Sequence, residues 1–254
     1  MVNIAIPRLK TGIRGLALPQ TFKSPTAARR LSAAIAIITA GVVAAAPVAN
    51  ANPKMVIDVK TGKVISHQEA FRKWYPASLT KLMTAYIAFS QMKAGKISPQ
   101  TEVVMSKKAA DQPASKMYFK PGQKLTMDSA LKLLLIKSAN DIAVAIAETI
   151  GGNTDNFVAQ MNAQAQRLGM NSTHYVNPNG LPGKGQYTTA RDLALLALII
   201  KREFPEYAHY FSLEGVTTGK KNYANFNMLV GRFDGADGMK TGFICASGFN
   251  QVAS

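Results

Sequence analysis

The order of hydrophobic patterns along the chain constrains its fold more than any other feature. Alternating strand patterns occupy residues 55–67, helical patterns fill most of residues 76–201, and short strand patterns return at 239–243 and 248–253. A glycine-containing turn divides the first pattern, which predicts a hairpin. This order predicts an α+β fold in which both chain ends build one antiparallel sheet and an all-helical region is inserted between them.

The first 51 residues have the features of an export signal. Two arginines precede an apolar run over residues 31–46, and Ala49-Asn50-Ala51 supplies the small residues of a cleavage site. We therefore expect residues 1–51 to be a signal peptide and residues 52–254 to be an exported domain on the periplasmic or cell-wall side of the inner membrane. A retained membrane anchor is the alternative, although the run is short for a bilayer and a proline follows it.

The composition argues against several other classes of protein. The chain has 30 Lys and Arg against 14 Asp and Glu, a net charge of +16, but its basic residues never run longer than two, so we expect no nucleic-acid partner. The single cysteine, Cys245, excludes an intramolecular disulfide. The histidines His67, His174 and His209 lack the spacing of metal ligands, so neither a metal site nor a cofactor is expected.

Three short motifs follow one another along the chain. Ser78-Leu79-Thr80-Lys81 is S-x-x-K at a predicted helix start, Ser138-Ala139-Asn140 is S-x-N between two helices, and Lys240-Thr241-Gly242 is K-T-G on a strand. Each is common by chance and has an ordinary alternative: a helix-terminal serine with a solvated lysine, a helix cap, or a strand that ends in a turn. Their joint order indicates a serine nucleophile with a lysine base.

The spacing within the first motif suits this chemistry. Lys81 lies three residues after Ser78, one helical turn along the same face, so its amine can reach the Ser78 hydroxyl. A hydroxyl is a poor nucleophile until a base takes its proton, and a free lysine, with a pKa of about 10.4, is charged at neutral pH. Burial and a nearby cation lower a lysine pKa. Lys240 is the candidate second cation, and we expect the two lysines to titrate as a pair.

With these motifs the chain resembles the serine D-alanyl-D-alanine carboxypeptidases, the low-molecular-weight penicillin-binding proteins, from about residue 52 to its end. The similarity includes Asn177-Pro178-Asn179-Gly180-Leu181 and the segment 237–243 around the third motif. It implies a β-lactamase-like fold whose sheet continues with a further strand and helix. Because the chain stops twelve residues after Gly242, we expect this sheet to lack its last strand and helix.

The resemblance also implies a reaction. In this family the serine attacks the carbonyl between the two D-alanines of a peptidoglycan pentapeptide, free D-alanine leaves, and water hydrolyses the acyl-enzyme. Ser78 would then be the nucleophile and Lys81 the proton acceptor, while Ser138 would pass a proton to the leaving nitrogen. The same resemblance implies that β-lactams acylate Ser78 and that the protein contacts the inner membrane peripherally.

The substrate-binding residues that the resemblance implies come from the second and third motifs. Asn140 would hold the amide on the acyl side, and Lys240 with Thr241 would bind the terminal carboxylate. Gly242 has no side chain to collide with a substrate strand alongside it. The backbone N–H of Phe243 would complete an oxyanion hole with that of the nucleophile.

Three other functions share part of this pattern. A class A β-lactamase needs a glutamate followed by an asparagine four residues later, and none of the four glutamates between the second and third motifs, Glu148, Glu203, Glu206 and Glu214, has one. An endopeptidase that cleaves wall cross-links would carry the same motifs. A catalytically weak wall-binding protein could also keep them, and covalent labelling by penicillin would separate it from the enzymes.

Overall fold

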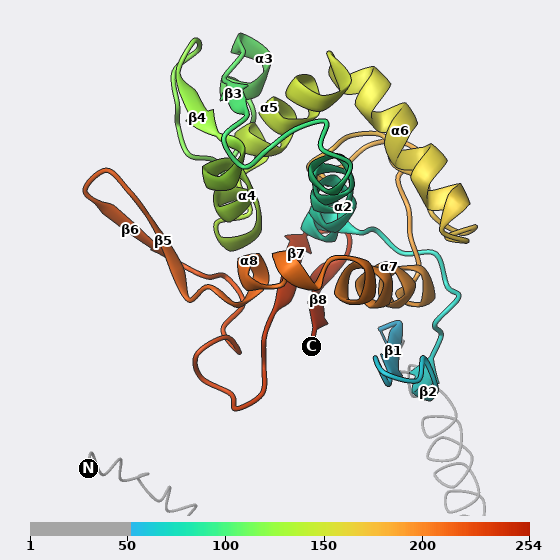
Figure 1. Ribbon diagram of the computed structural model, residues 1–254. Coiled ribbons are helices and arrows are strands. Elements are labelled where there is room, and N and C mark those ends of the chain that lie inside the picture. The colour runs from blue at the N-terminus through green and yellow to red at the C-terminus, as the bar shows by residue number, and fades with distance from the viewer. Residues whose placement is uncertain (1–51) are drawn as a thin grey trace, which may run out of the picture. The chain divides into compact units, whose positions relative to one another are not determined.

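Strands occupy both ends of residues 52–254, the part of the chain that the computed structural model describes, and helices occupy the middle (Figure 1). This order confirms the predicted α+β class. The predicted signal peptide, residues 1–51, lies outside the described residues. Within residues 52–254, no helix is both long enough and apolar enough to span a lipid bilayer.

Each end of the described chain forms an antiparallel hairpin. β1 (Lys54–Ile57) pairs with β2 (Val64–Gln68), and β7 (Met239–Ile244) pairs with β8 (Gly248–Ala253). Within the described residues the two hairpins are not hydrogen-bonded to each other, so the chain ends do not build the single sheet expected from the sequence. A cavity of about 500 Å³ lies between β1 and β8, and both strands pack against α7 (Ala190–Glu203) instead.

The longer helices form the region between the hairpins. They are α2 (Lys81–Lys93), α4 (Met127–Ile136), α5 (Asn140–Gly151), α6 (Thr154–Arg167) and α7. Helix α2 is buried along nearly its whole length, and α4, α5, α6 and α7 all contact it. This arrangement makes α2 the centre of the hydrophobic core, which explains why its sequence is apolar on more than one face.

Aromatic stacking fixes the chain that follows α7 onto the core. Phe89 of α2 stacks on Tyr207 and Tyr210 with ring centroids 4.9 and 5.9 Å apart. These tyrosines belong to η2 (Pro205–Tyr207) and α8 (His209–Ser212). Helix α8 in turn contacts β7, so the packing connects the central helix to the strand that carries the third motif.

Several short elements had no clear signal in the sequence. They are η2, α8, β3 (Glu102–Val104), α3 (Lys107–Ala110) and β4 (Lys124–Thr126). Each has only three or four residues, which is too short for a hydrophobic period to develop. The antiparallel pairing of β3 with β4 depends on partners about twenty residues apart in the sequence, which local patterns do not reveal.

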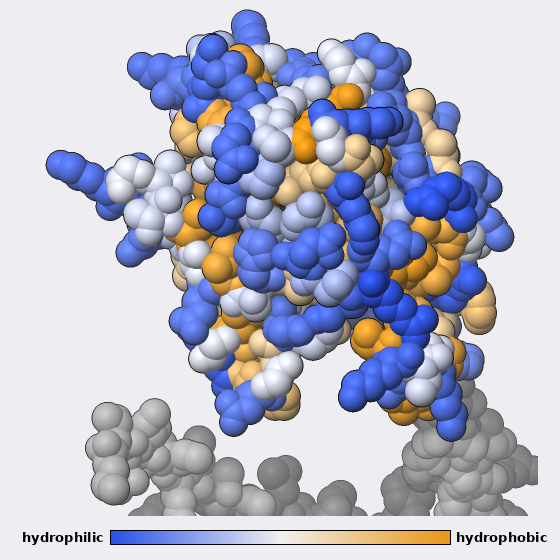
Figure 2. All heavy atoms as spheres, viewed as in Figure 1, coloured by the Kyte–Doolittle hydropathy of each residue, from blue (hydrophilic) through white to orange (hydrophobic). Residues whose placement is uncertain are grey.

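A third hairpin projects away from the rest of residues 52–254 (Figure 1). It consists of β5 (Gly215–Thr218) and β6 (Lys221–Ala224), which pair antiparallel. Its projecting tip is hydrophilic in Figure 2, and its turn contains Lys220. Residues 225–238 then lead from this hairpin to β7 and pass beside the site described next.

Candidate active site

Ser78 lies on a short 3-10 helix, η1 (Ala77–Thr80), that runs directly into α2. Side chains three residues apart in a 3-10 helix stand almost in line, because the helix has about three residues per turn. Lys81 therefore follows Ser78 on the same side, and its Nζ lies 3.0 Å from Ser78 Oγ. The lysine is fully buried, so it is not the solvated side chain of the ordinary alternative.

Two further oxygens surround the Lys81 amine. Nζ donates to Asn140 Oδ1 at 2.8 Å and to the backbone carbonyl of Asn179 at 2.5 Å. Both oxygens can only accept hydrogen bonds, so they occupy the two N–H groups of a neutral amine. The remaining lone pair then faces the Ser78 hydroxyl, which is the orientation that a general base requires.

The surroundings of the two lysines favour their neutral forms. Burial lowers the pKa of Lys81 well below its ordinary value, and the charge of Lys240 lowers it further, while Asp141 opposes both effects. Burial also lowers the pKa of Lys240 to about 7. No ion pair joins either lysine to an acid within the described residues.

Strand β7 lies directly against the nucleophile turn. A Cβ atom on Gly242 would be 3.0 Å from the backbone N of Ser78 and 3.2 Å from that of Leu79. The missing side chain therefore lets the strand approach the turn, whatever its role toward a substrate. Lys240 is buried and its Nζ donates to the Thr241 carbonyl at 2.8 Å, whereas Phe243 is 52% exposed.

The second motif lies between α4 and α5. Ser138 has a positive φ of 58°, and its buried Oγ has no hydrogen-bond partner within residues 52–254. Asn140 Nδ2 donates to the Pro113 carbonyl at 3.0 Å, which leaves Oδ1 for Lys81. The cap of α5 is Ala139, without a side-chain capping bond, so helix capping does not account for either polar residue.

The loop that contains residues 177–181 presses against the nucleophile turn, a contact that local sequence patterns do not predict. Asn177 Oδ1 accepts from the Gly180 N–H at 2.7 Å, and this places the Asn179 carbonyl on Lys81. Gly180 has a φ of +86°, and a Cβ there would lie 1.8 Å from the Ala77 carbonyl oxygen. From composition alone, the turn-forming residues of this segment predict a loop, but they do not predict that the loop contacts the nucleophile turn.

Asp141 was not among the predicted site residues, yet it shapes one wall of the site. Its Oδ2 accepts from the backbone N–H groups of Met117 at 2.8 Å and Tyr118 at 3.1 Å. Asp141 directly follows Asn140, so the carboxylate ties residues 113–118 to the start of α5. These bonds hold Ala114 and Ser115 at the edge of the cleft.

A cleft of about 740 Å³ opens beside Ser78. The S-x-N residues, the loop after β6, the strand β7 and the start of β8 all contribute to its walls. Its polar lining comes from Ser78, Ser115, Ser138, Asn140, Asn179, Asn225, Asn227, Thr241, Asn250 and Gln251, and its large apolar lining from Leu181, Phe226, Met228, Leu229, Phe243, Ile244 and Phe249. The structure thus brings residues of all three motifs to one cleft, with Lys81 and Lys240 buried next to it.

Comparison with known proteins identifies the family. A family model described as D-alanyl-D-alanine carboxypeptidase, peptidase S11, matches residues 40–254. The chain belongs to this family. D-alanyl-D-alanine carboxypeptidase DacC of Escherichia coli K12 is 35% identical over 216 residues, which cover 82% of this chain and 54% of that protein. DacF of Bacillus subtilis is 34% identical over 212 residues, 80% of this chain and 54% of that protein.

Solved structures of penicillin-binding proteins have the same fold. Penicillin-binding protein 5 from Haemophilus influenzae matches with a TM-score of 0.77 and 33% identity, covering 82% of this chain and 62% of that chain. Penicillin-binding protein D2 from Listeria monocytogenes, solved in its cefotaxime-bound form, matches with a TM-score of 0.72 and 29% identity over 80% of this chain and 83% of that chain. The present chain spans about half the length of the curated relatives that it matches.

Proposed function

We propose that this protein is a serine DD-carboxypeptidase that removes the terminal D-alanine from peptidoglycan stem peptides. One observation carries the proposal: a buried lysine amine, Lys81, lies 3.0 Å from the Ser78 hydroxyl and has two acceptor oxygens on its other side. This geometry supports a neutral lysine as the base for a serine nucleophile. Membership of the carboxypeptidase family supports the substrate class.

The acylation step uses the two serines and Lys81. Lys81 Nζ takes the proton of Ser78 as Oγ attacks the carbonyl carbon between the two D-alanines. The C–N bond then breaks, and the leaving nitrogen receives a proton through Ser138, whose Oγ has no other partner among residues 52–254. The products are an acyl-ester on Ser78 and free D-alanine.

The remaining motif residues hold the substrate in this proposal. The backbone N–H groups of Ser78 and Phe243 stabilise the oxyanion, and Asn140 binds the acyl-side amide. Lys240 and Thr241 bind the terminal carboxylate, which favours a carboxypeptidase over an enzyme that cuts inside a chain. In deacylation the oxygen of a water molecule bonds to the acyl carbon as the ester bond breaks, and a proton of that water passes to the Ser78 oxygen.

Penicillin and a peptide provide the test. Intact-mass analysis after penicillin treatment should show one adduct on the peptide that contains Ser78, and Ser78→Ala should abolish it. The protein should release D-alanine from diacetyl-Lys-D-Ala-D-Ala but little from the same peptide ending in L-Ala-L-Ala. An adduct that persists in Ser78→Ala would exclude the proposed nucleophile, and penicillin turnover without D-alanine release would indicate a β-lactamase.

Export completes the proposal, because peptidoglycan lies outside the cytoplasm. Its support is the sequence of residues 1–51 and the family to which the chain belongs. Sequencing of the protein recovered from outside the cytoplasm should start at Asn52. Recovery of the intact Met1 terminus there would contradict a cleaved signal peptide.

A further inference from the structure

The cleft beside Ser78 has an uncharged lining. Within the part of the chain that the structure describes, no Asp, Glu, Lys or Arg side chain lines it. Lys240 is 1% exposed, and its Nζ donates to a backbone carbonyl. A substrate carboxylate in this cleft would therefore depend on neutral hydrogen-bond donors as well as on the buried lysine.

Apart from the Ser138 hydroxyl, one buried neutral donor at the cleft has no partner within residues 52–254. Asn227 lines the cleft and is 2% exposed, and its Nδ2 forms no hydrogen bond within residues 52–254. Its Oδ1 accepts from Gln251 Nε2 at 3.0 Å and from the Leu229 N–H at 3.2 Å. These two donors fix which end of the amide is the oxygen, so the unpartnered atom is an N–H donor.

The unpartnered donor belongs to a polar group that begins at the third motif. Thr241 and Gln251 are directly opposite each other in the pairing of β7 with β8, so their side chains lie on the same face of the hairpin. Gln251 then hydrogen-bonds Asn227 across the cleft wall. Thr241, Gln251 and Asn227 thus form a continuous row of hydroxyl and amide groups along one side of the cleft.

We propose that Asn227 is a specificity-determining residue that donates a hydrogen bond from Nδ2 to the terminal carboxylate of the substrate, with Gln251 as the residue that positions it. The inference rests on the proposed function and deepens it. A carboxylate offers the buried donor two charged acceptor oxygens, whereas a terminal amide offers one neutral oxygen, and a hydrogen bond to a charged acceptor is the stronger one. The row therefore selects substrates that end in a free carboxylate.

The test compares two peptides on matched variants. Diacetyl-Lys-D-Ala-D-Ala and the same peptide with a C-terminal amide differ only at the group that Asn227 is proposed to bind. Asn227→Asp keeps the acceptor for Gln251 and Leu229 but replaces the free donor with a negative oxygen. The ratio of kcat/KM for the acid over the amide should fall by about tenfold or more.

Two further variants separate recognition from general effects. Asn222→Asp adds the same charge at an exposed position of β6 that does not line the cleft, and it should change the ratio much less. Gln251→Leu removes the positioning bond and should lower the ratio by a smaller factor than Asn227→Asp. It also provides the test if Asn227→Asp does not fold, as judged by circular dichroism.

The possible outcomes are distinct. Equal losses of kcat/KM for the acid and the amide in Asn227→Asp would show a structural role alone and overturn the inference, while the proposed function would stand. The same holds for Gln251→Leu if only that variant folds. Rates that do not change for either peptide would also overturn the inference. If the unmodified protein releases no D-alanine from the acid peptide, the proposed function fails, and the inference fails with it.

Discussion

At the residue scale, the two lysines have similar surroundings but different proposed tasks. Both are buried, and burial lowers both pKa values. Lys81 faces the nucleophile and must be neutral to accept a proton, whereas Lys240 must be charged to attract a carboxylate. Because the charge of Lys240 lowers the pKa of Lys81, a neutral Lys81 beside a protonated Lys240 is the working combination.

Arginine substitutions separate the two tasks. Lys81→Arg keeps a positive charge but cannot release its proton at working pH, so penicillin acylation should fall by about a thousandfold. Lys240→Arg keeps a cation for the carboxylate and should retain part of the activity. Stopped-flow acylation rates measure both, and equal rates in the two variants would contradict the division of roles.

The pH profile should show both groups. The peptide kcat/KM should rise with pH as Lys81 loses its proton, and this rise should finish well below the ordinary lysine range. It should fall above about pH 7 as Lys240 of the free enzyme loses its charge. Lys240→Arg should remove the fall but keep the rise, and a descending limb that persists in this variant would assign it to another group.

Gly180 offers a steric test of the nucleophile turn. Gly180→Ala places a methyl group in the position of the Ala77 carbonyl and should displace Ser78, so acylation should fall by about a hundredfold. Gly122→Ala is the matched control, because Gly122 has a similar φ of +83° but has open space around it. Both variants carry the backbone strain of a left-handed alanine, and only the first should lose acylation.

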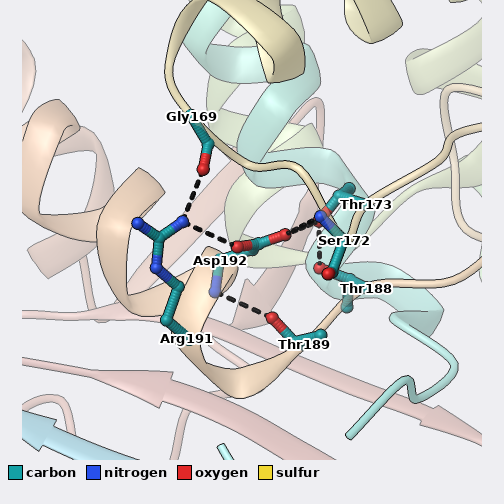
Figure 3. A network of polar contacts seen from close by, with 7 residues as sticks. All are labelled: Gly169, Ser172, Thr173, Thr188, Thr189, Arg191 and Asp192. Carbon is teal, nitrogen blue, oxygen red and sulfur yellow. Dashed lines mark hydrogen bonds and ion pairs between the residues drawn. The ribbon is translucent and has the colours of Figure 1, made fainter. Parts of the chain in front are cut away.

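At the scale of elements, buried side-chain bonds hold the loops around the site. Figure 3 shows Asp192, in the first turn of α7, accepting from the Ser172 N–H at 3.0 Å and from Thr173 Oγ1 at 2.7 Å. Thr188, which contacts Thr173, exchanges two backbone bonds with Trp74 just before the nucleophile turn. One carboxylate thus connects α7 to the loop after α6 and to the chain that leads to Ser78.

The same residue shows how far local patterns predict. Thr189 and Asp192 have the spacing of a capping box, and Thr189 Oγ1 does accept from the Asp192 N–H at 3.1 Å. In a capping box the side chain at the position of Asp192 would also accept from the Thr189 backbone N–H. The Asp192 carboxylate instead accepts from Ser172 and Thr173. Helix starts were predictable because caps are local, whereas the distant partner of a buried carboxylate depends on the packing.

Asp192→Ala should destabilise the protein and weaken acylation together. The substitution leaves buried donors without an acceptor, so the free energy of unfolding should fall by about 3 kcal/mol. Asp155→Ala, in the first turn of α6 but exposed, removes the same charge and should change stability by less than about 0.5 kcal/mol. Urea titration measures the free energy of unfolding of the two variants. If both lose similarly small amounts of stability, the hydrogen bonds of Asp192 do not hold the loops.

At the scale of the whole molecule, the order of elements was predictable and the contacts between distant segments were not. Periodicity gave the helices α2, α4, α5, α6 and α7 and the strands β7 and β8, since each is long enough for a pattern. The prediction that the two end hairpins pair into one sheet was wrong for the described residues, because the strand pattern of a sequence does not specify which strand is its partner. Likewise the three motifs were visible in the sequence, but Asp141, Asn179 and Asn227 reach the site through packing alone.

The buried lysines make the stability of the whole domain depend on pH. Unfolded Lys240 keeps its proton up to about its ordinary pKa of 10.5, whereas folded Lys240 loses it near 7. Between these values the unfolded chain binds more protons, so a rise in pH favours the folded state. Calorimetry should show the Tm of the wild type gaining more between pH 7 and pH 9.5 than that of Lys240→Met. Equal gains would mean that Lys240 is not buried in solution.

Among residues 52–254 no acid is paired with Lys81 or Lys240, and this also limits how the sequence can change. An apolar residue of similar length would fill either position without leaving an unpaired amine in the core, and such a replacement should stabilise the fold while it removes the chemistry. Random mutagenesis screened only for thermal resistance should therefore accumulate inactive proteins altered at these two positions. Screens for a more robust enzyme need an activity filter in every round.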